Sequence, residues 1–374
     1  MSVPPSPLTP PSDPLAKGSA AGSPRVLIAR MSAIGDTILT LPVACRLREA
    51  FPHAFLAWVV EEKSAAFVVG HPVLDEVIVV PRGWFTKPAE IVALRRRLRP
   101  LRLQTALDCQ GLTKSALACW LSGASRRIGF AGAHGGELSP WLNNRLVTNR
   151  HPHVTDRSLE LLGEVGLAGL VGKPGVRWDV PIPAEAVTSV AAKLPSWAQA
   201  RSFAVINPGA TWDSKLWSMD RFGSLAARLG ETLGMKTLVV WGGKRELNDA
   251  QHIANNSDGW AELAPATTLR ELAAVLSLAR LVVSSDTGPM HLAVAVGAPT
   301  VGLHGATRPQ DCGPYGAPHL GLLKQFQAGG RRERRQADNS AMLAISVDDA
   351  WHACRQVLER SAMPTDSLRI AKAS

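Results

Sequence analysis

The sequence contains little tyrosine, phenylalanine or cysteine. Of its 374 residues, one is Tyr, eight are Phe and five are Cys, although eleven are Trp. Because no run interleaves basic with aromatic residues, the chain lacks the stacking surface of single-strand nucleic-acid binders. The cysteines are widely spaced and none forms a CxxC pair, so they predict reduced core thiols in a cytoplasmic protein. Neither a disulfide framework nor a zinc site is expected.

Long apolar runs and several catalytic motifs are also absent. No stretch reaches the roughly 18 uninterrupted apolar residues that a membrane-spanning helix needs. The N-terminus has no apolar signal core, and its Pro, Ser and Gly content predicts a disordered tail over 1–23. Walker A, HExxH and GxSxG motifs are missing, and "GFAGAHGG" is not a GxGxxG at a strand–helix turn, which disfavours dinucleotide binding.

Basic residues are in excess. The chain has 41 Lys and Arg against 31 Asp and Glu, a formal net charge of +10. That charge suits acidic partners such as phosphates, anionic lipid surfaces or nucleic acid, or it serves solubility alone. Four arginines gather at 331–335 in "KQFQAGGRRERRQADNS". This segment predicts an exposed loop that is either merely solvated or in contact with an acidic surface or substrate.

Strands and helices alternate along most of the chain. One series runs from the strand "RVLIAR" and the helix "TILTLPVACRLREAF" to the helix "LTKSALACWLSG", and a second runs from "SFAVINPGA" to "PTVGLHG". This alternation predicts parallel sheets covered on both faces, and the continuous apolar strands fit that burial. The fold class is therefore α/β, with two doubly wound parallel-sheet domains.

A Pro- and Gly-rich segment, residues 171–186, separates the two series and predicts a linker. A final helix is expected from Ser346, because Ser346 and Asp348 suit a helix N-terminus. The chain is thus expected to form a tail, two domains, and a C-terminal helix with its own tail, over residues 1–23, 24–178, 179–345 and 346–374.

Unusual residues follow the first strand, in "RVLIARMSAIGDTILTLP". Ser32, Gly35 and Asp36 lie between this strand and a helix expected to begin at about Thr37. In open α/β sheets, ligands bind beyond the carboxyl ends of the strands. Asp36 is therefore either a helix N-cap or a carboxylate presented to a ligand as a general base.

A second strand end lies in "INPGATWDSKLWSMDRF". Thr211 and Lys215 precede a helix that Ser218 is expected to cap. A lysine and a hydroxyl beside a helix N-terminus make a suitable diphosphate site. The alternative is a solvated loop lysine.

The third strand end is "LVVSSDTGPMHLAVAVG". Thr287 and Gly288 would offer unpaired backbone N–H groups and a hydroxyl to phosphate oxygens at the start of a helix. Asp286 would accept hydrogen bonds from loop N–H groups, orient Lys215, or serve only as a cap. His291 lies inside the Ala-rich helix, a position that favours packing over catalysis.

Together these segments resemble glycosyltransferase family 9, the ADP-heptose:lipopolysaccharide heptosyltransferases. The resemblance runs from about Arg25 to Arg360 and is closest to the enzymes that add the first heptose. It rests on blocks in the family's order: "RVLIARMSAIGDTILTLP", "WVVEE", "DCQGLTKSA", "SKLWS", "WGG" and "SDTGPMHLAVAVGAPTVGLHGAT".

The resemblance implies a GT-B fold, in which two Rossmann-like domains flank an interdomain cleft. It implies inverting transfer of heptose from ADP-L-glycero-β-D-manno-heptose to a Kdo hydroxyl of lipid A-linked Kdo. Asp36 matches the general base, and Glu246 matches an acid on the adenosine ribose. The other matches lie on the donor side, at Thr211, Lys215, Asp286, Thr287, Gly288 and His291, and on the acceptor side, at Ser32, Gly35, Gln110 and Lys114.

This chemistry predicts no essential metal and no cofactor, because helix N–H groups and Lys215 would stabilise the departing ADP. The expected partners are an ADP-sugar and a lipid-linked anionic glycan, whose phosphates and carboxylates the basic helix "LRRRLRPLR" would face together with Lys114. No nucleic acid is expected. The lipid-linked acceptor implies a cytoplasmic protein, peripheral on the cytoplasmic face of the inner membrane.

Three alternatives remain open. The chain has Arg308-Pro309 where the family commonly has an acid–proline pair, which leaves room for another acceptor or another nucleotide sugar. GT-B-like nucleotide-sugar epimerases share the two-domain design. A basic protein that binds nucleic acid or a lipid surface, without catalysis, would explain the net charge but not Asp36 or Lys215.

Overall fold

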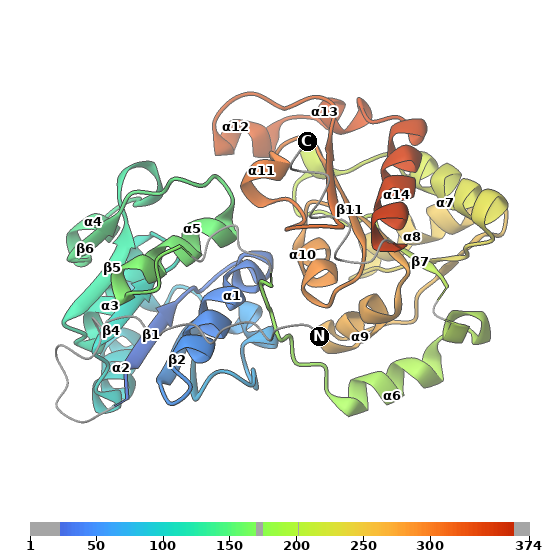
Figure 1. The fold of residues 1–374 in the computed structure, drawn as a ribbon. Coiled ribbons are helices and arrows are strands. Elements are labelled where there is room, and N and C mark those ends of the chain that lie inside the picture. The colour runs from blue at the N-terminus through green and yellow to red at the C-terminus, as the bar shows by residue number, and fades with distance from the viewer. Residues whose placement is uncertain (1–22, 170–174, 201, 363–374) are drawn as a thin grey trace, which may run out of the picture. The chain divides into compact units, whose positions relative to one another are not determined.

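The computed structural model describes residues 23–169, 175–200 and 202–362 (Figure 1). The chain divides into two compact units between Asp179 and Val180. The boundary predicted from the sequence lies one residue earlier, between residues 178 and 179. The tail predicted over 1–23 lies outside the described residues except for Ser23, as do residues 170–174 of the predicted linker.

The N-terminal unit contains a sheet of six strands in the order β3-β2-β1-β4-β5-β6. Every neighbouring pair in it is parallel. The strands are β1 (Arg25–Ala29), β2 (Phe55–Glu61), β3 (Glu76–Val80), β4 (Thr105–Asp108), β5 (Arg126–Phe130) and β6 (Arg145–Val147).

Helices cover both faces of this sheet. Leu27 and Ala29 of β1 join a buried cluster with Leu94 and Cys119 on one face, while Val26 and its alternating neighbours are buried toward the other. The α-helices are α1 (Ile34–Ala50), α2 (Pro88–Leu98), α3 (Thr113–Ser122), α4 (Ser139–Leu142) and α5 (Val154–Glu160). The 3₁₀ turns are η2 (Glu62–Phe67), η3 (Trp84–Thr86), η4 (Arg99–Leu101), η5 (Gly132–His134) and η6 (Leu161–Val165).

The C-terminal unit repeats this plan with six parallel strands in the order β12-β11-β10-β7-β8-β9. They are β7 (Ala204–Asn207), β8 (Thr237–Val239), β9 (Ala261–Leu263), β10 (Leu281–Ser285), β11 (Thr300–His304) and β12 (Leu320–Leu323). The helices are α6 (Ala184–Lys193), α7 (Met219–Leu233), α8 (Lys244–Asn255), α9 (Leu269–Leu278), α10 (Gly288–Ala295), α11 (Pro309–Cys312), α12 (Arg331–Gln336), α13 (Ser340–Leu343) and α14 (Val347–Ala362), with 3₁₀ turns η7 (Ser196–Ala200) and η8 (Asp213–Lys215).

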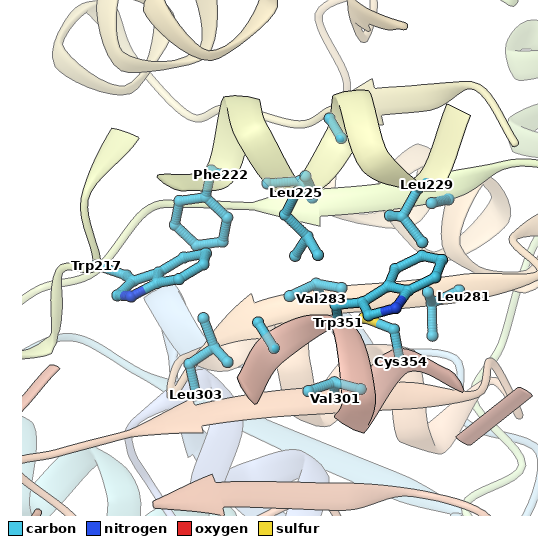
Figure 2. Close-up of a cluster of buried hydrophobic side chains, with 14 of the residues drawn as sticks. Trp217, Phe222, Leu225, Leu229, Leu281, Val283, Val301, Leu303, Trp351 and Cys354 are labelled. Carbon is cyan, nitrogen blue, oxygen red and sulfur yellow. The ribbon is translucent and has the colours of Figure 1, made fainter. Parts of the chain in front are cut away.

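The helix expected at the end of the chain, α14, belongs to the core of the C-terminal unit. Figure 2 shows Trp351 and Cys354 of α14 facing Leu229 of α7 over strands β10 and β11. At the other end of this cluster, the rings of Trp217 and Phe222 meet edge to face, with centroids 4.8 Å apart. This packing holds β10 rigidly, and β10 ends next to Asp286.

The expected α/β class with two doubly wound parallel sheets is confirmed, and two local predictions are wrong. The arginine-rich segment is the exposed helix α12 instead of a loop, because Glu333 reaches back to accept from Gly330 N at 2.6 Å and caps it. Helix α1 begins at Ile34, three residues before the predicted start, so Asp36 occupies its first turn.

Candidate active site

Three of the residues expected on the acceptor side meet at the carboxyl edge of the N-terminal sheet. Lys114 Nζ donates to Ser32 Oγ at 2.8 Å, and Gln110 Nε2 donates to the same hydroxyl at 3.4 Å. Lys114 also forms an ion pair of 2.5 Å with Glu61, the last residue of β2. Gly35 is buried in the first turn of α1. We refer to Ser32, Glu61, Gln110 and Lys114 as the Ser32 cluster.

The sheet order explains why the Ser32 cluster forms. Strand β1 lies between β2 and β4, and all three are parallel, so the residues that end or follow them share one edge. The side chain of Gln110 is fixed from behind, because its Oε1 accepts from Met31 N at 2.9 Å. The cluster thus offers an ammonium, a hydroxyl, an amide and the carboxylate of Glu61. The ammonium suits a carboxylate or a phosphate, and the four groups together suit sugar hydroxyls.

Asp36 lies at the start of α1 with both carboxylate oxygens engaged. Arg30 Nη2 is 3.0 Å from Asp36 Oδ1, and Ala33 N donates to Oδ2 at 3.2 Å. Asp36 is therefore not the N-cap residue, which is Ala33. Arg30 is buried while the Asp36 side chain is 41% exposed, so the carboxylate is oriented from the protein side and open to an incoming hydroxyl.

In the C-terminal unit, Lys215 pairs with Asp286, in agreement with the predicted alternative that Asp286 orients this lysine. Lys215 Nζ lies 2.6 Å from Asp286 Oδ2 and donates to the Asp286 carbonyl at 3.2 Å. The ammonium also lies over the ring of Trp212, 4.6 Å from its centroid. These three contacts fix the end of a long side chain. The predicted alternative of a freely solvated lysine is wrong.

Asp286 accepts from side chains instead of from loop N–H groups, so that part of the prediction is wrong. Thr307 Oγ1 donates to Asp286 Oδ2 at 2.6 Å, and His291 Nε2 lies 3.7 Å from Oδ1. Burial alone raises the pKa of the Asp286 carboxyl, but Lys215, His304 and His291 outweigh burial and hold the pKa well below its ordinary value. Asp286 is therefore an ionised, buried hub.

The proton on His304 follows from this hub. An ionised carboxylate only accepts hydrogen bonds, so Thr307 uses its hydroxyl proton on Asp286. His304 Nδ1, 3.2 Å from Thr307 Oγ1, must then be the donor of that pair. His304 thus donates to Thr307 and Thr307 to Asp286, while Lys215 donates to Asp286 from the other side. These bonds link the end of β11 to the η8 turn.

The start of α10 presents two backbone donors. The hydroxyl of Thr287, the N-cap residue, accepts from Asn207 Nδ2 at 3.0 Å and donates to Ser285 O at 3.2 Å. Met290 N is satisfied by the Thr287 carbonyl. Within the described part of the chain, the N–H groups of Thr287 and Gly288 donate to no protein acceptor. They are available to an anion, as predicted for a helix N-terminus.

Glu246 lies in the first turn of α8, against glycines that follow β7 and β8. Its carboxylate accepts from Gly242 N at 2.6 Å, and a Cβ on Gly209 would come within 2.5 Å of it. Burial raises the pKa of Glu246 above its ordinary value. Thr211 is exposed on the loop before η8. Ser218 occupies the N-cap position of α7, but its side chain makes no capping bond.

Four residues of these clusters were not predicted from the sequence: Arg30, Glu61, His304 and Thr307. The first three end a strand or directly follow one, within the quoted segments "RVLIAR", "WVVEE" and "PTVGLHG". Inspecting every polar residue at the carboxyl end of a strand would have found them. Thr307 lies three residues beyond β11, and no sequence pattern marks it.

Neither a metal-binding group nor a membrane-spanning helix is found in residues 23–169, 175–200 and 202–362. No three His, Cys, Asp or Glu side chains in these ranges are grouped to hold a metal ion. None of the helices there is both long and apolar enough to cross a bilayer. The roles of the predicted site residues, and the interdomain cleft, stay predictions.

Comparisons with known proteins point to one family. The profile of glycosyltransferase family 9 (heptosyltransferase) matches residues 91–341. Lipopolysaccharide heptosyltransferase 1 of Escherichia coli K12 is 31% identical over 302 residues, which cover 78% of this chain and 91% of the relative. The protein of the same name from Pseudomonas aeruginosa is also 31% identical, over 81% of this chain and 84% of its own.

A solved structure has the same fold. Escherichia coli heptosyltransferase WaaC with ADP aligns over 89% of this chain and 99% of its own, at 26% identity and a TM-score of 0.71. A putative UDP-N-acetylglucosamine 2-epimerase from Listeria monocytogenes aligns with a TM-score of 0.53 at 11% identity. This second likeness concerns the fold alone.

The buried position of Asp286 leads to a stability prediction. In Asp286→Ala the Lys215 ammonium, whose side chain is 13% exposed, keeps no carboxylate partner. We expect the free energy of unfolding, measured with urea, to fall by about 3 kcal/mol. Asp213→Ala is the matched control, because Asp213 lies in η8, the turn that also contains Lys215, and forms a solvent-exposed ion pair with Arg245. That variant should lose less than about 1 kcal/mol. Equal losses in the two variants would contradict the role of Asp286 as a buried hub.

Proposed function

The chain belongs to glycosyltransferase family 9 and has the GT-B fold, and on that basis we propose that it transfers heptose from an ADP-heptose to an acceptor of the lipopolysaccharide core. The chain is thus a glycosyltransferase. The sugar and the pathway are those for which its relatives, the lipopolysaccharide heptosyltransferases, are named. The observation that carries the proposal is the start of α10, where two N–H groups have no protein acceptor and directly follow Asp286, the residue that fixes the ammonium of Lys215.

On the donor side, the N–H groups of Thr287 and Gly288 and the ammonium of Lys215 bind the diphosphate. As the bond from the anomeric carbon to the ADP oxygen breaks, the electron pair leaves with ADP and its negative charge grows. Groups already fixed in position stabilise that charge without reorganising. Asp286 is a positioning residue in this proposal, because it holds Lys215 and touches no substrate.

On the acceptor side, Asp36 removes the proton of the attacking hydroxyl as the oxygen bonds to the anomeric carbon. Attack opposite to the leaving ADP inverts the configuration in a single displacement. The Ser32 cluster binds the anionic acceptor, which we take to be a Kdo-lipid A type glycan. An acceptor in a bilayer places the protein peripherally at the cytoplasmic face of the inner membrane.

No metal is needed for this step, because Lys215 and the two N–H groups together supply the positive charge that a divalent cation would bring. The acid assistance that a poor leaving group requires is also unnecessary for a diphosphate. The proposal therefore needs one carboxylate, Asp36, and no second general acid.

The transfer is tested by incubating the protein with ADP-heptose, with and without Kdo-lipid A, in EDTA. We expect ADP release that depends on the acceptor, and a product heavier by one heptose in mass spectrometry. Release of nucleotide without acceptor would favour hydrolysis or epimerase-type chemistry. Loss of all activity in EDTA, with recovery on adding Mg²⁺, would contradict the metal-free part.

The base is tested by Asp36→Asn, which keeps the size of the side chain but cannot accept a proton. Turnover should fall by a factor of about 10² or more, while the affinity for ADP stays unchanged. Asp75→Asn is the control, because Asp75 is equally exposed and pairs with Arg48 as Asp36 pairs with Arg30. An unchanged rate in Asp36→Asn would remove Asp36 from this role.

A further inference from the structure

Residues 138–147, which include α4 and β6, expose large apolar side chains. Trp141 is 86% exposed, Leu138 57% and Leu146 45%. Isolated exposed apolar residues are ordinary, but three within nine positions, one of them an almost fully exposed tryptophan, form an unusual surface for a soluble protein. We refer to residues 138–147 as the α4–β6 segment.

The α4–β6 segment is held firmly from its inner side. Ser139 Oγ donates to Asp108 Oδ2 at 2.7 Å, and Asn143 Nδ2 donates to the same oxygen at 3.0 Å. Asp108 is the last residue of β4, and all three side chains are buried. The exposure of Trp141 therefore belongs to an anchored helical turn, whose outer face is apolar although its inner face has polar partners.

This segment adjoins the Ser32 cluster. Leu138 N donates to Thr113 Oγ1 at 3.2 Å, and Thr113 N donates to Glu137 Oε2 at 3.0 Å. Thr113 directly precedes Lys114, whose ammonium bonds to Ser32. The exposed apolar side chains thus begin within one hydrogen bond of the element that carries the predicted acceptor-binding lysine, in the same unit and at the same edge of the sheet.

The charged residues in the segment and directly after it are basic. Residues 138–150, "LSPWLNNRLVTNR", contain Arg145 and Arg150 and no acidic residue, and both arginines are exposed. The neighbouring Glu137 is engaged by Thr113. Tryptophan and leucine flanked by arginines suit the boundary between water and lipid, where the rings lie among headgroups and the guanidinium groups meet phosphates.

We propose that the α4–β6 segment is a membrane-contact surface for a bilayer that carries anionic headgroups. Leu138, Trp141 and Leu146 enter the interfacial region, and Arg145 and Arg150 bind the headgroup phosphates. The contact is reversible, because it buries only a few side chains. It brings the Ser32 cluster to the bilayer surface, where a lipid-linked acceptor is available; this last role rests on the proposed function.

The experiment is co-sedimentation of the full chain with sucrose-loaded vesicles. Vesicles of phosphatidylglycerol and phosphatidylcholine are compared with phosphatidylcholine alone. We expect binding to the anionic vesicles, and a fall in affinity of about tenfold or more in Leu138→Ser/Trp141→Ser. Val187→Ser/Leu233→Ser is the matched control, because these side chains are 44% and 43% exposed in the other unit. It should bind like the parent.

Equal vesicle binding by the two double variants would overturn the proposal. So would a parent that is dimeric in lipid-free solution and monomeric in Leu138→Ser/Trp141→Ser, because a second copy would then be the occupant. An acceptor without acyl chains distinguishes a failure of the membrane-contact proposal from a failure of the proposed function. Membrane contact predicts unchanged turnover of the variant on that soluble acceptor and reduced turnover on the vesicle-bound one. If no acceptor is used but binding depends on Trp141, only the proposed function fails.

Discussion

The ion pair between Lys215 and Asp286 is the interaction on which the C-terminal site depends. A lysine is long and rotatable, so it is a poor element of a fixed site unless its end is held. Asp286 holds it, and is itself held by Thr307 and the neighbouring histidines behind it. Asp286 follows β10 and Thr307 follows β11, so the contacts among these residues fix the Lys215 ammonium against the core of the C-terminal unit.

In the N-terminal unit, ion pairs likewise orient the charged side chains of the predicted site. A carboxylate that must take a proton has to be oriented yet open, and Asp36 achieves this with Arg30 beneath it and solvent above. Lys114 is likewise oriented by Glu61 and Ser32. In the two units, the charges of Asp36, Lys114 and Lys215 each have a partner of opposite sign within the protein.

The elements of the fold that could be predicted from the sequence are those with a clear pattern of apolar residues. Strands β5, β6, β9 and β12 were not identified, because they are three to five residues long and are interrupted by arginine, glutamate or glycine. Asp36, Lys215 and Asp286 were found because they follow strands. Arg30 and Glu61 also end or follow strands and could have been found in the same way. Thr307 required the tertiary packing that places it beside Asp286.

The central claim is that two backbone N–H groups and Lys215 bind the diphosphate without a metal. Amide ¹H–¹⁵N spectra of the full chain, titrated with ADP in EDTA, test it directly. The claim predicts that the signals of Thr287 and Gly288 move downfield and saturate with the nucleotide, as expected for new hydrogen bonds to phosphate. Saturable binding of ADP that leaves both signals in place would contradict it.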